Sequence, residues 1–176
     1  LIDLLNDYGI TASVTDIDGN EYKTIKIGDQ LWMAENLKTT TFRNGAQIGN
    51  LSDVTVWPGY TLDAYCWYDK DASKYKDVFG AIYNWHAVGT GKLCPTGWHV
   101  PTDAEWTTLS TFLGGVNIAG GKLKETGTTL WQSPNTGATN ESGFSGRPAG
   151  LRSGESNVFL LVHVVHVGGF PTGIYR

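Results

Sequence analysis

The sequence predicts an α+β fold built from short strands, short helices and long loops. Glycine occurs 23 times in 176 residues, and aromatic residues make up 12% of the chain. This composition, with little leucine-rich periodicity, favours loops and short strands over a helix bundle. A turn between alternating runs predicts a hairpin near the N-terminus, and a capping signal predicts a helix in the middle of the chain. The length suits one domain with its own core.

Charge and hydropathy exclude two classes of partner. The net charge is −4 and there is no basic block, so we expect no binding to nucleic acid, which relies on clustered Lys and Arg. The longest apolar run is VFLLVHVVHV at 158–167. It is much shorter than the roughly 20 residues that a transmembrane helix needs, so we expect no membrane span.

Strand signals are concentrated in the first half of the chain. Asp18-Gly19-Asn20 is typical of a turn, and the residues of 21–27 alternate before a second turn leads into a strand at 30–33. We therefore expect a hairpin or meander. Residues 64–68 predict a short aromatic strand, and 69–77 a charged, exposed connection.

Two further segments are harder to assign. The apolar stretch 79–88 fits a strand or a short helix, and we favour a helix over 83–88. Residues 1–8, LIDLLNDY, fit a short amphipathic helix or an assembly arm within an N-terminal segment, 1–13.

The stretch GKLCPTGWHVPTDAEW, residues 91–106, predicts the start of a helix. Thr102 and Glu105 form the pattern of a capping box, in which each side chain binds the other residue's backbone N–H. Asp103 adds negative charge to the first turn, where the helix dipole favours it. Apolar residues then recur at helical spacing until Gly114-Gly115 ends the helix.

The same stretch places Cys94 five residues before His99. A nucleophile with its base, or part of a zinc site, would use these residue types. Neither a third catalytic group nor two further zinc ligands follow at a suitable spacing, so we interpret the stretch as a strand–turn–helix joint.

Cys66 and Cys94 are the two cysteines of the chain. A disulfide between them would close a loop of roughly 28 residues and stabilise the fold by about 3–4 kcal/mol in the chain-entropy model. Two free, buried thiols are the alternative, and pairing cannot be deduced from sequence.

Aromatic residues are dense over 57–68. Exposed rings suit the flat faces of sugars or a protein contact, whereas buried rings would fill the core. We expect most of them, and Trp67 and Trp85 in particular, to be buried. The candidate ligand-binding residues are Trp57, Tyr60, Tyr65 and Tyr68.

Metal-ligand candidates occur twice. The loop 133–144 offers the oxygen ligands Asn135, Asn140 and Glu141, which could take part in a calcium site or in a hydrogen-bonded surface loop. His163 and His166 would share a face only in a helix, but their Val-rich context favours a strand. We therefore expect either no cofactor or calcium.

Six motifs follow one another along the chain: VTDIDGNEYKTIKIGDQLWMAENLKTT, AYCWYDKD, FGAIYNWHAV, GKLCPTGWHVPTDAEW, GGKLKETGTTLW and SPNTGATNESGFSGRPAGLR. In this order they closely resemble the Fibrobacter succinogenes major paralogous domain. The resemblance covers 14–152. The family occurs in secreted proteins and lipoproteins of Bacteroidetes and Fibrobacter relatives, and it has no established activity.

The resemblance implies a C-type-lectin-like fold, with small twisted antiparallel sheets, two short helices and long irregular loops. HVPTDAEW is also similar to a helix start of the formylglycine-generating-enzyme group. The tail 153–176 departs from the family pattern, because no Trp follows Trp131 and no Cys follows Cys94. The missing late cysteine favours a Cys66–Cys94 pair.

These observations together predict a non-enzymatic binding or adhesion module, extracellular or at the cell surface, that recognises a glycan or a protein. One alternative is a structural subunit of a surface assembly or filament that self-associates through 1–8 or 158–167. Another is an oxidase of the formylglycine-generating group, whose resemblance implies a copper-holding cysteine pair near the end of the domain. This chain has no cysteine there.

Overall fold

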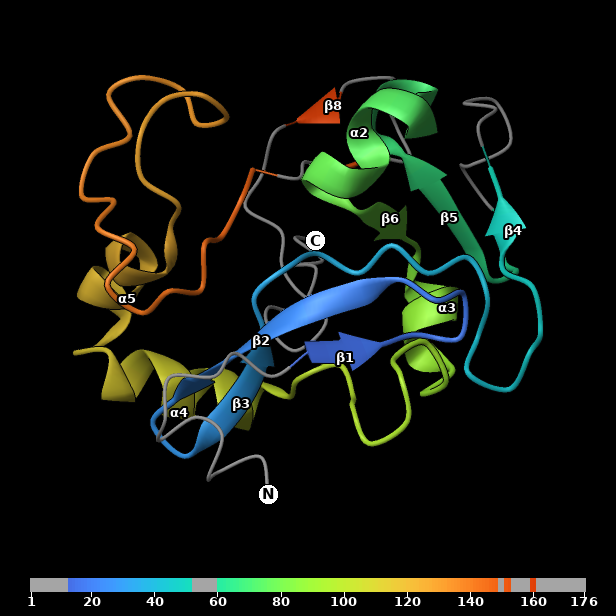
Figure 1. The fold of residues 1–176 in the computed structure, drawn as a ribbon, viewed down its shortest axis with the longest axis horizontal. Coiled ribbons are helices and arrows are strands. Elements are labelled where there is room, and N and C mark those ends of the chain that lie inside the picture. The colour runs from blue at the N-terminus through green and yellow to red at the C-terminus, as the bar shows by residue number, and fades with distance from the viewer. Residues whose placement is uncertain (1–12, 52–59, 149–150, 153–158, 161–176) are drawn as a thin grey trace.

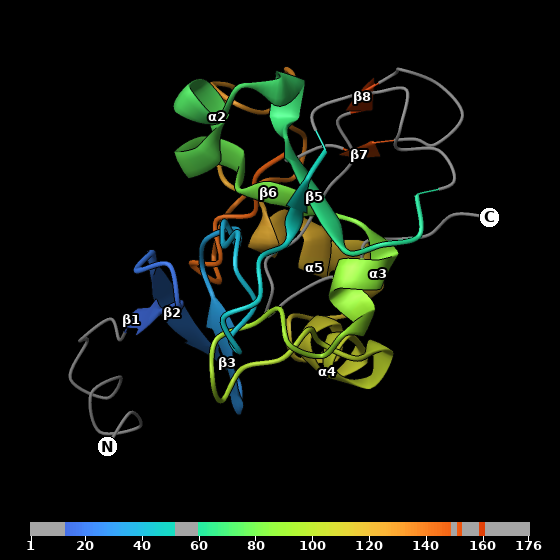
Figure 2. The same cartoon turned by 90° about the vertical axis from the view of Figure 1, so that its right-hand side faces the viewer.

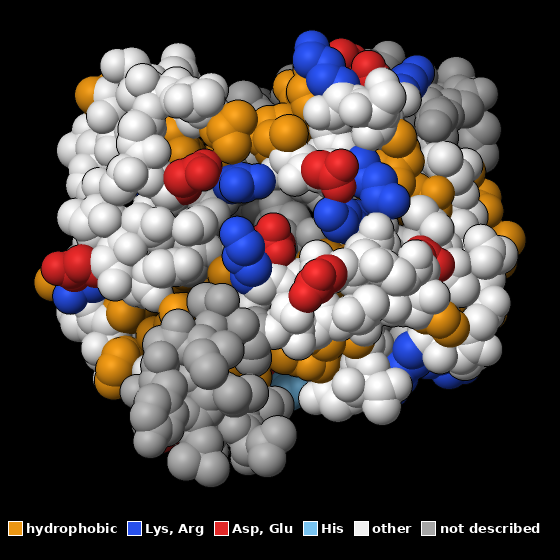
Figure 3. Space-filling model, in the orientation of Figure 1, with side chains coloured by type: hydrophobic (Ala, Val, Ile, Leu, Met, Phe, Trp, Pro, Cys, Tyr) orange, Lys and Arg blue, Asp and Glu red, His pale blue; other side chains and the backbone are white. Residues whose placement is uncertain are grey.

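The computed structural model describes residues 13–51, 60–148, 151–152 and 159–160 (Figure 1). The predictions for 1–8, Trp57, His163 and His166 lie outside these residues, as does all of 158–167 except the backbone of two positions. No helix in the described residues is long and apolar enough to cross a membrane. On the face shown in Figure 3, Lys and Arg side chains alternate with Asp and Glu and form no continuous basic patch.

The first sheet is the predicted hairpin with one more strand. β1 (Ser13–Thr15), β2 (Glu21–Ile27) and β3 (Gln30–Met33) are antiparallel in the order β1-β2-β3. Side chains along β2 alternate between exposed and buried from Glu21 to Thr24, as expected for a strand with one face on the core. The hairpin prediction is therefore confirmed, with β3 at the edge of the sheet.

The second sheet is mixed. β4 (Gly49–Asn50) is parallel to β5 (Ala64–Trp67), and β5 is antiparallel to β6 (Ala81–Tyr83). Every side chain of β5 is buried, which confirms the predicted aromatic strand. β7 (Leu151–Arg152) and β8 (Phe159–Leu160) form a separate antiparallel pair.

Helices lie beside these sheets (Figures 1 and 2). The structure describes four α-helices, where the resemblance implied two, and a short 3-10 helix, η1. They are η1 (Tyr68–Lys70), α2 (Ala72–Phe79), α3 (Trp85–Gly89), α4 (Asp103–Phe112) and α5 (Val116–Leu123). The molecule is an α+β domain of small sheets and short helices, as predicted.

Two helices differ from their predictions. The segment 69–77 is not a simple exposed connection, because most of it forms α2. The Asp71 side chain caps α2 by accepting from the amide of Lys74, and Phe79 is buried. The stretch 79–88 contains both of the expected alternatives, since β6 ends where the Asn84 side chain caps α3.

The buried side chains form two clusters. One lies between the sheets and includes Tyr22, Tyr65 and Trp67. The other joins the β2–β3 hairpin to α4 and α5 and includes Trp32 and Trp106, whose ring centroids are 5.0 Å apart.

Trp67 is buried as predicted, but the prediction for Trp85 is wrong, because 63% of its surface is exposed. Trp85 is the first residue of α3, and the buried side of this one-turn helix is occupied by Ala87. Its apolar sequence neighbours therefore belong to a different face or element.

Helix α5 carries two adjacent glycines with different surroundings. A Cβ on Gly121 would lie 2.2 Å from the carbonyl oxygen of Gly137, whereas a Cβ on Gly120 would meet nothing within 4 Å. The loop around 137 docks directly on the helix here, and the amide of Thr139 donates to the carbonyl of Gly121 at 2.9 Å. Gly121 therefore provides the close approach that the loop requires.

Candidate binding site

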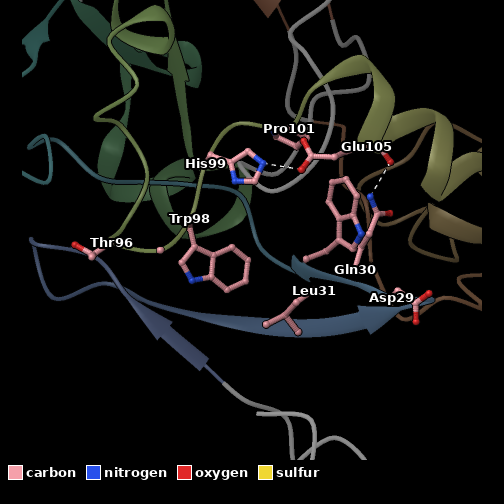
Figure 4. Close-up of a pocket in the computed structure, with 10 residues that line it drawn as sticks. Asp29, Gln30, Leu31, Thr96, Trp98, His99, Pro101 and Glu105 are labelled. Carbon is pink, nitrogen blue, oxygen red and sulfur yellow. Dashed lines mark hydrogen bonds and ion pairs between the residues drawn. The ribbon is translucent and has the colours of Figure 1, made fainter. Parts of the chain in front are cut away.

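A cavity of about 510 Å³ opens between strand β3 and the segment that leads into helix α4 (Figure 4). Its volume is in the range typical of small-molecule sites. It is lined by Asp29, Gln30, Leu31, Trp32, Thr96, Gly97, Trp98, His99, Pro101 and Glu105.

Local turns and one long-range contact build the two walls. The amide of Trp98 donates to the carbonyl of Pro95 at 3.0 Å, and Gly97 has a φ of +86°. This left-handed conformation favours glycine and turns Trp98 back along the chain. Across the cavity, Gln30 Nε2 donates to the carbonyl oxygen of Glu105 at 3.0 Å. This bond fixes β3 against the first turn of α4.

The carboxylate of Glu105 serves both the helix and the cavity. Its Oε2 accepts from the amide of Thr102 at 2.7 Å and from the Thr102 hydroxyl at 2.9 Å. The amide of Glu105 in turn donates to the Thr102 hydroxyl at 3.3 Å, so the predicted capping box is present. The other oxygen, Oε1, lies 2.7 Å from His99 Nε2. The backbone amide of Thr102, helped by the hydroxyl of the same residue and by His99, lowers the pKa of Glu105 below its usual 4.5.

This arrangement determines the tautomer of His99. An ionised carboxylate can only accept hydrogen bonds, so His99 Nε2 must carry the hydrogen. The neutral ring then has a bare Nδ1, which accepts no hydrogen bond from the described residues. The His99 side chain is 65% exposed. Its Nδ1 can therefore accept from a ligand when the ring is neutral and donate when it is charged.

The rest of the cavity lining mixes apolar residues, among them Leu31, Trp98 and Pro101, with polar ones. Trp98 is partly buried and packs on the first core cluster, and in Figure 4 its indole lies beside His99 with Leu31 and Gln30 opposite. The ionisable lining residues are Asp29, His99 and Glu105, and none of the lining residues is Lys or Arg. The cavity therefore disfavours anionic ligands.

The predicted aromatic ligand residues lie elsewhere. Tyr65 is only 7% exposed and packs edge-on against Trp67. Tyr68 is partly buried and packs against Tyr75 and Phe79. Tyr60 is also partly buried. Most of this aromatic segment therefore contributes to packing, and the described tyrosines do not line the cavity.

The predicted calcium ligands attach the loop 133–144 to residues on either side of it. Asn135 Nδ2 donates to two backbone carbonyl oxygens at 3.0 and 2.7 Å. Asn140 exchanges two hydrogen bonds with Ser145, and Glu141 pairs with Lys122 at 3.0 Å. Within the ranges that the structure describes, no group of three or more His, Cys, Asp and Glu could hold a metal ion. The calcium site stays a prediction.

Both cysteines are buried, and they form no disulfide with each other in the structure. Burial raises the pKa of the Cys94 thiol to about 12, so this thiol is a weak nucleophile. The imidazole of His99 contacts Glu105. Cys94 packs in the first core cluster. The structure thus pairs His99 with the helix cap.

Part of this site is visible in the sequence. The pattern predicts the Thr102–Glu105 cap and includes His99, but it does not by itself connect His99 to Glu105 or distinguish Trp98 and Gln30. The six-residue spacing of His99 and Glu105 was the available signal, since a capping glutamate places its carboxylate beside the chain that enters the helix.

The geometry defines a small α+β domain with an open pocket that is edged by aromatic, imidazole, amide and carboxylate groups. The sequence pattern of the Fibrobacter succinogenes major domain family matches residues 25–164. The chain belongs to that family, and the match continues past the boundary at 152 that the resemblance suggested. Neither the curated proteins nor the solved structures compared with the chain include a match.

Proposed function

We propose that the chain is a non-enzymatic binding module, acting outside the cell or at its surface, that recognises a neutral glycan in the cavity beside α4. The observation that carries the proposal is the Trp98 indole next to His99, with the Gln30 amide across the cavity. An indole face packs well on the C–H face of a sugar ring, and fixed polar groups can bind its hydroxyls.

The charges in the cavity support a neutral ligand. Asp29 and Glu105 line it without a compensating Lys or Arg, so sugars that carry carboxylate, sulfate or phosphate would be repelled. Neutral sugars avoid this penalty.

The state of Glu105 supports binding over catalysis. A general acid in glycoside hydrolysis needs a raised carboxyl pKa. The capping bonds of Thr102 lower the pKa of Glu105 instead, and they hold the carboxylate in an accepting role. The residue is therefore suited to orienting His99.

The test is a screen of neutral and acidic glycans, followed by calorimetric titration of the best ligand. We expect Trp98→Ala to weaken binding more than tenfold, because a central aromatic contact is lost. Trp85→Ala is the matched control, since Trp85 is an exposed tryptophan outside the cavity. Circular dichroism verifies that both variants fold. Equal affinity of Trp98→Ala and the parent, or equal weakening by both variants, would contradict the proposal.

A further inference from the structure

The free edge of strand β3 borders the cavity. The lining takes in a run of consecutive residues, Asp29, Gln30, Leu31 and Trp32. Side chains of neighbouring strand residues leave opposite faces of a sheet, so a cavity that takes in every residue of such a run lies along the edge of the strand. In the described residues β3 pairs with β2 alone. The edge at the cavity is therefore the side of β3 that faces away from β2.

The pairing with β2 determines which backbone groups point out of this edge. Facing residues of an antiparallel ladder alternate between hydrogen-bonded and non-hydrogen-bonded pairs. The Ala34 amide donates to the Lys23 carbonyl at 2.8 Å, which makes these two residues a bonded pair. Along the register from this pair, Trp32 belongs to a bonded pair and Leu31 to a non-bonded one. The Leu31 N–H and C=O therefore point away from β2, toward the cavity.

These two groups of Leu31 have no partner in the part of the chain that the structure describes. The residue is only partly buried. Backbone N–H and C=O groups are strong donors and acceptors that are rarely left without a partner away from water. A ligand in the cavity can bind both groups while the bond between Gln30 Nε2 and the Glu105 carbonyl stays intact.

The geometry of the two groups selects the complementary ligand group. The N–H and C=O of one extended residue leave the same side of the strand in nearly parallel directions, as they do toward a neighbouring strand. A single oxygen atom cannot be well aligned with both. Two hydroxyl groups on adjacent carbon atoms can, because one accepts from the N–H while the other donates to the C=O.

We infer that the cavity selects sugars with two adjacent free hydroxyl groups, which bind the backbone N–H and C=O of Leu31. This inference rests on the proposed function and adds the ligand group and the atoms that recognise it. The Trp98 indole lies opposite Leu31 (Figure 4). A sugar ring that packs on the indole can therefore direct its hydroxyl groups toward the edge of β3.

The test begins with the methyl glycosides of glucose, galactose and mannose, which all carry hydroxyl groups at carbons 2, 3 and 4. The one that binds most tightly is compared with its 2-deoxy, 3-deoxy and 4-deoxy analogues. Every adjacent pair includes the hydroxyl at carbon 3, so we expect the 3-deoxy analogue to bind about tenfold more weakly. Only one of the other two analogues should be weakened by a similar factor, because only one pair is used.

Amide hydrogen exchange shows whether the contact is at Leu31. The Leu31 amide should exchange rapidly in the free protein and about tenfold more slowly at saturating glycoside. The Trp32 amide is the internal control, because its bond to β2 protects it in both states.

A pair of variants isolates the donor. Leu31→Pro removes the N–H and spares the ladder, since edge strands accept proline where the N–H faces outward. Leu31→Ala shortens the side chain and keeps the N–H. We expect Leu31→Pro to bind the glycoside about tenfold more weakly than Leu31→Ala does. If Leu31→Pro does not fold, the deoxy series and the exchange data decide.

Each other outcome overturns a defined statement. If the parent glycoside and its 3-deoxy analogue bind equally, or if the glycoside leaves Leu31 exchange unchanged, the inference fails and the proposed function stands. If none of the three glycosides binds, the inference fails, because each carries the adjacent hydroxyl groups. If a wider panel of neutral glycans also fails to bind, the proposed function fails with it. Protection of the Leu31 amide by an alanine tripeptide blocked at both ends, and not by the glycosides, would mean that the strand edge binds an extended peptide and that the assignment to a sugar is wrong.

Discussion

Replacing Glu105 with Gln should invert the tautomer of His99. In the parent protein, Glu105 Oε2 accepts two hydrogen bonds from Thr102, and Oε1 faces His99 Nε2. A glutamine has one accepting oxygen, and we expect it to accept the two hydrogen bonds from the Thr102 amide and hydroxyl. Its NH₂ group then points at His99 Nε2, which must become the acceptor, so the ring hydrogen moves to Nδ1.

The same change should cost about 1 kcal/mol of unfolding free energy. A carboxylate in the first turn of a helix stabilises it by about 0.3–1 kcal/mol, and charge-assisted hydrogen bonds are roughly twice as strong as neutral ones. The Glu105 side chain is 34% exposed, so solvent screens part of the gain and the lower half of this range applies to the dipole. The capping box itself survives, because Gln also occupies this position of the motif.

Nitrogen NMR of the His99 imidazole identifies the tautomer, since protonated and bare ring nitrogens have distinct chemical shifts. Spectra should be recorded above the pH at which the ring is charged. Asp103→Asn is the matched control, because it removes a charge from the same helical turn without touching His99. The reasoning is refuted if the parent has the hydrogen on Nδ1, or if Glu105→Gln leaves it on Nε2.

Three further predictions concern stability and reactivity. The pKa of Glu105 is lowered from 4.5, so the parent should be more stable than Glu105→Gln above about pH 4.5, and this difference should disappear as the pH falls through the folded-state pKa. Urea denaturation between about pH 7 and pH 3 measures the difference in unfolding free energy. A difference that stays constant over this range would contradict the prediction. Gly120→Ala should raise the unfolding free energy by about 0.5–1 kcal/mol. Gly121→Ala should lower it by about 2 kcal/mol or more, because the new Cβ would collide with the docked loop. If both variants shift the melting temperature in the same direction, the close approach at Gly121 is refuted. Cys66 and Cys94 should resist a thiol reagent near pH 8 in the folded protein and react in urea without reductant; no reaction in urea would instead indicate the disulfide.

The elements that sequence predicted are those with local signals. Turn residues between alternating runs predict the hairpin of β2 and β3, and the capping box and the glycines after the helix predict α4. The sequence does not predict helix α2, because most of its residues are polar or charged and Phe79 is its single buried residue, which gives no apolar periodicity. Helix α5 was missed because paired glycines oppose helix formation, and the reason for Gly121 lies in a loop that packs on it.

The pocket could not be predicted from spacing alone. Its two walls meet through the Gln30 side chain and the Glu105 carbonyl, which are 75 residues apart in the chain. Tertiary packing also decides which aromatic rings are exposed. Tyr65 lies in the core, whereas Trp85 is at the surface. Aromatic density alone therefore does not tell which rings are available to a ligand, and the aromatic ligand residues expected from 57–68 stay a prediction.

The shared use of Glu105 has a consequence for how this pocket can change its ligand. Glu105 and the amide of Gln30 hold α4 in place, so substituting either disturbs the fold together with the site. Asp29 and Thr96 also line the cavity, are exposed, and carry none of these bonds. We therefore expect substitutions at Asp29 and Thr96 to alter ligand preference while leaving the melting temperature within about 2 °C of the parent value. If Asp29→Asn and Thr96→Ala lower stability as much as Glu105→Gln does, the division between supporting and selecting residues is wrong.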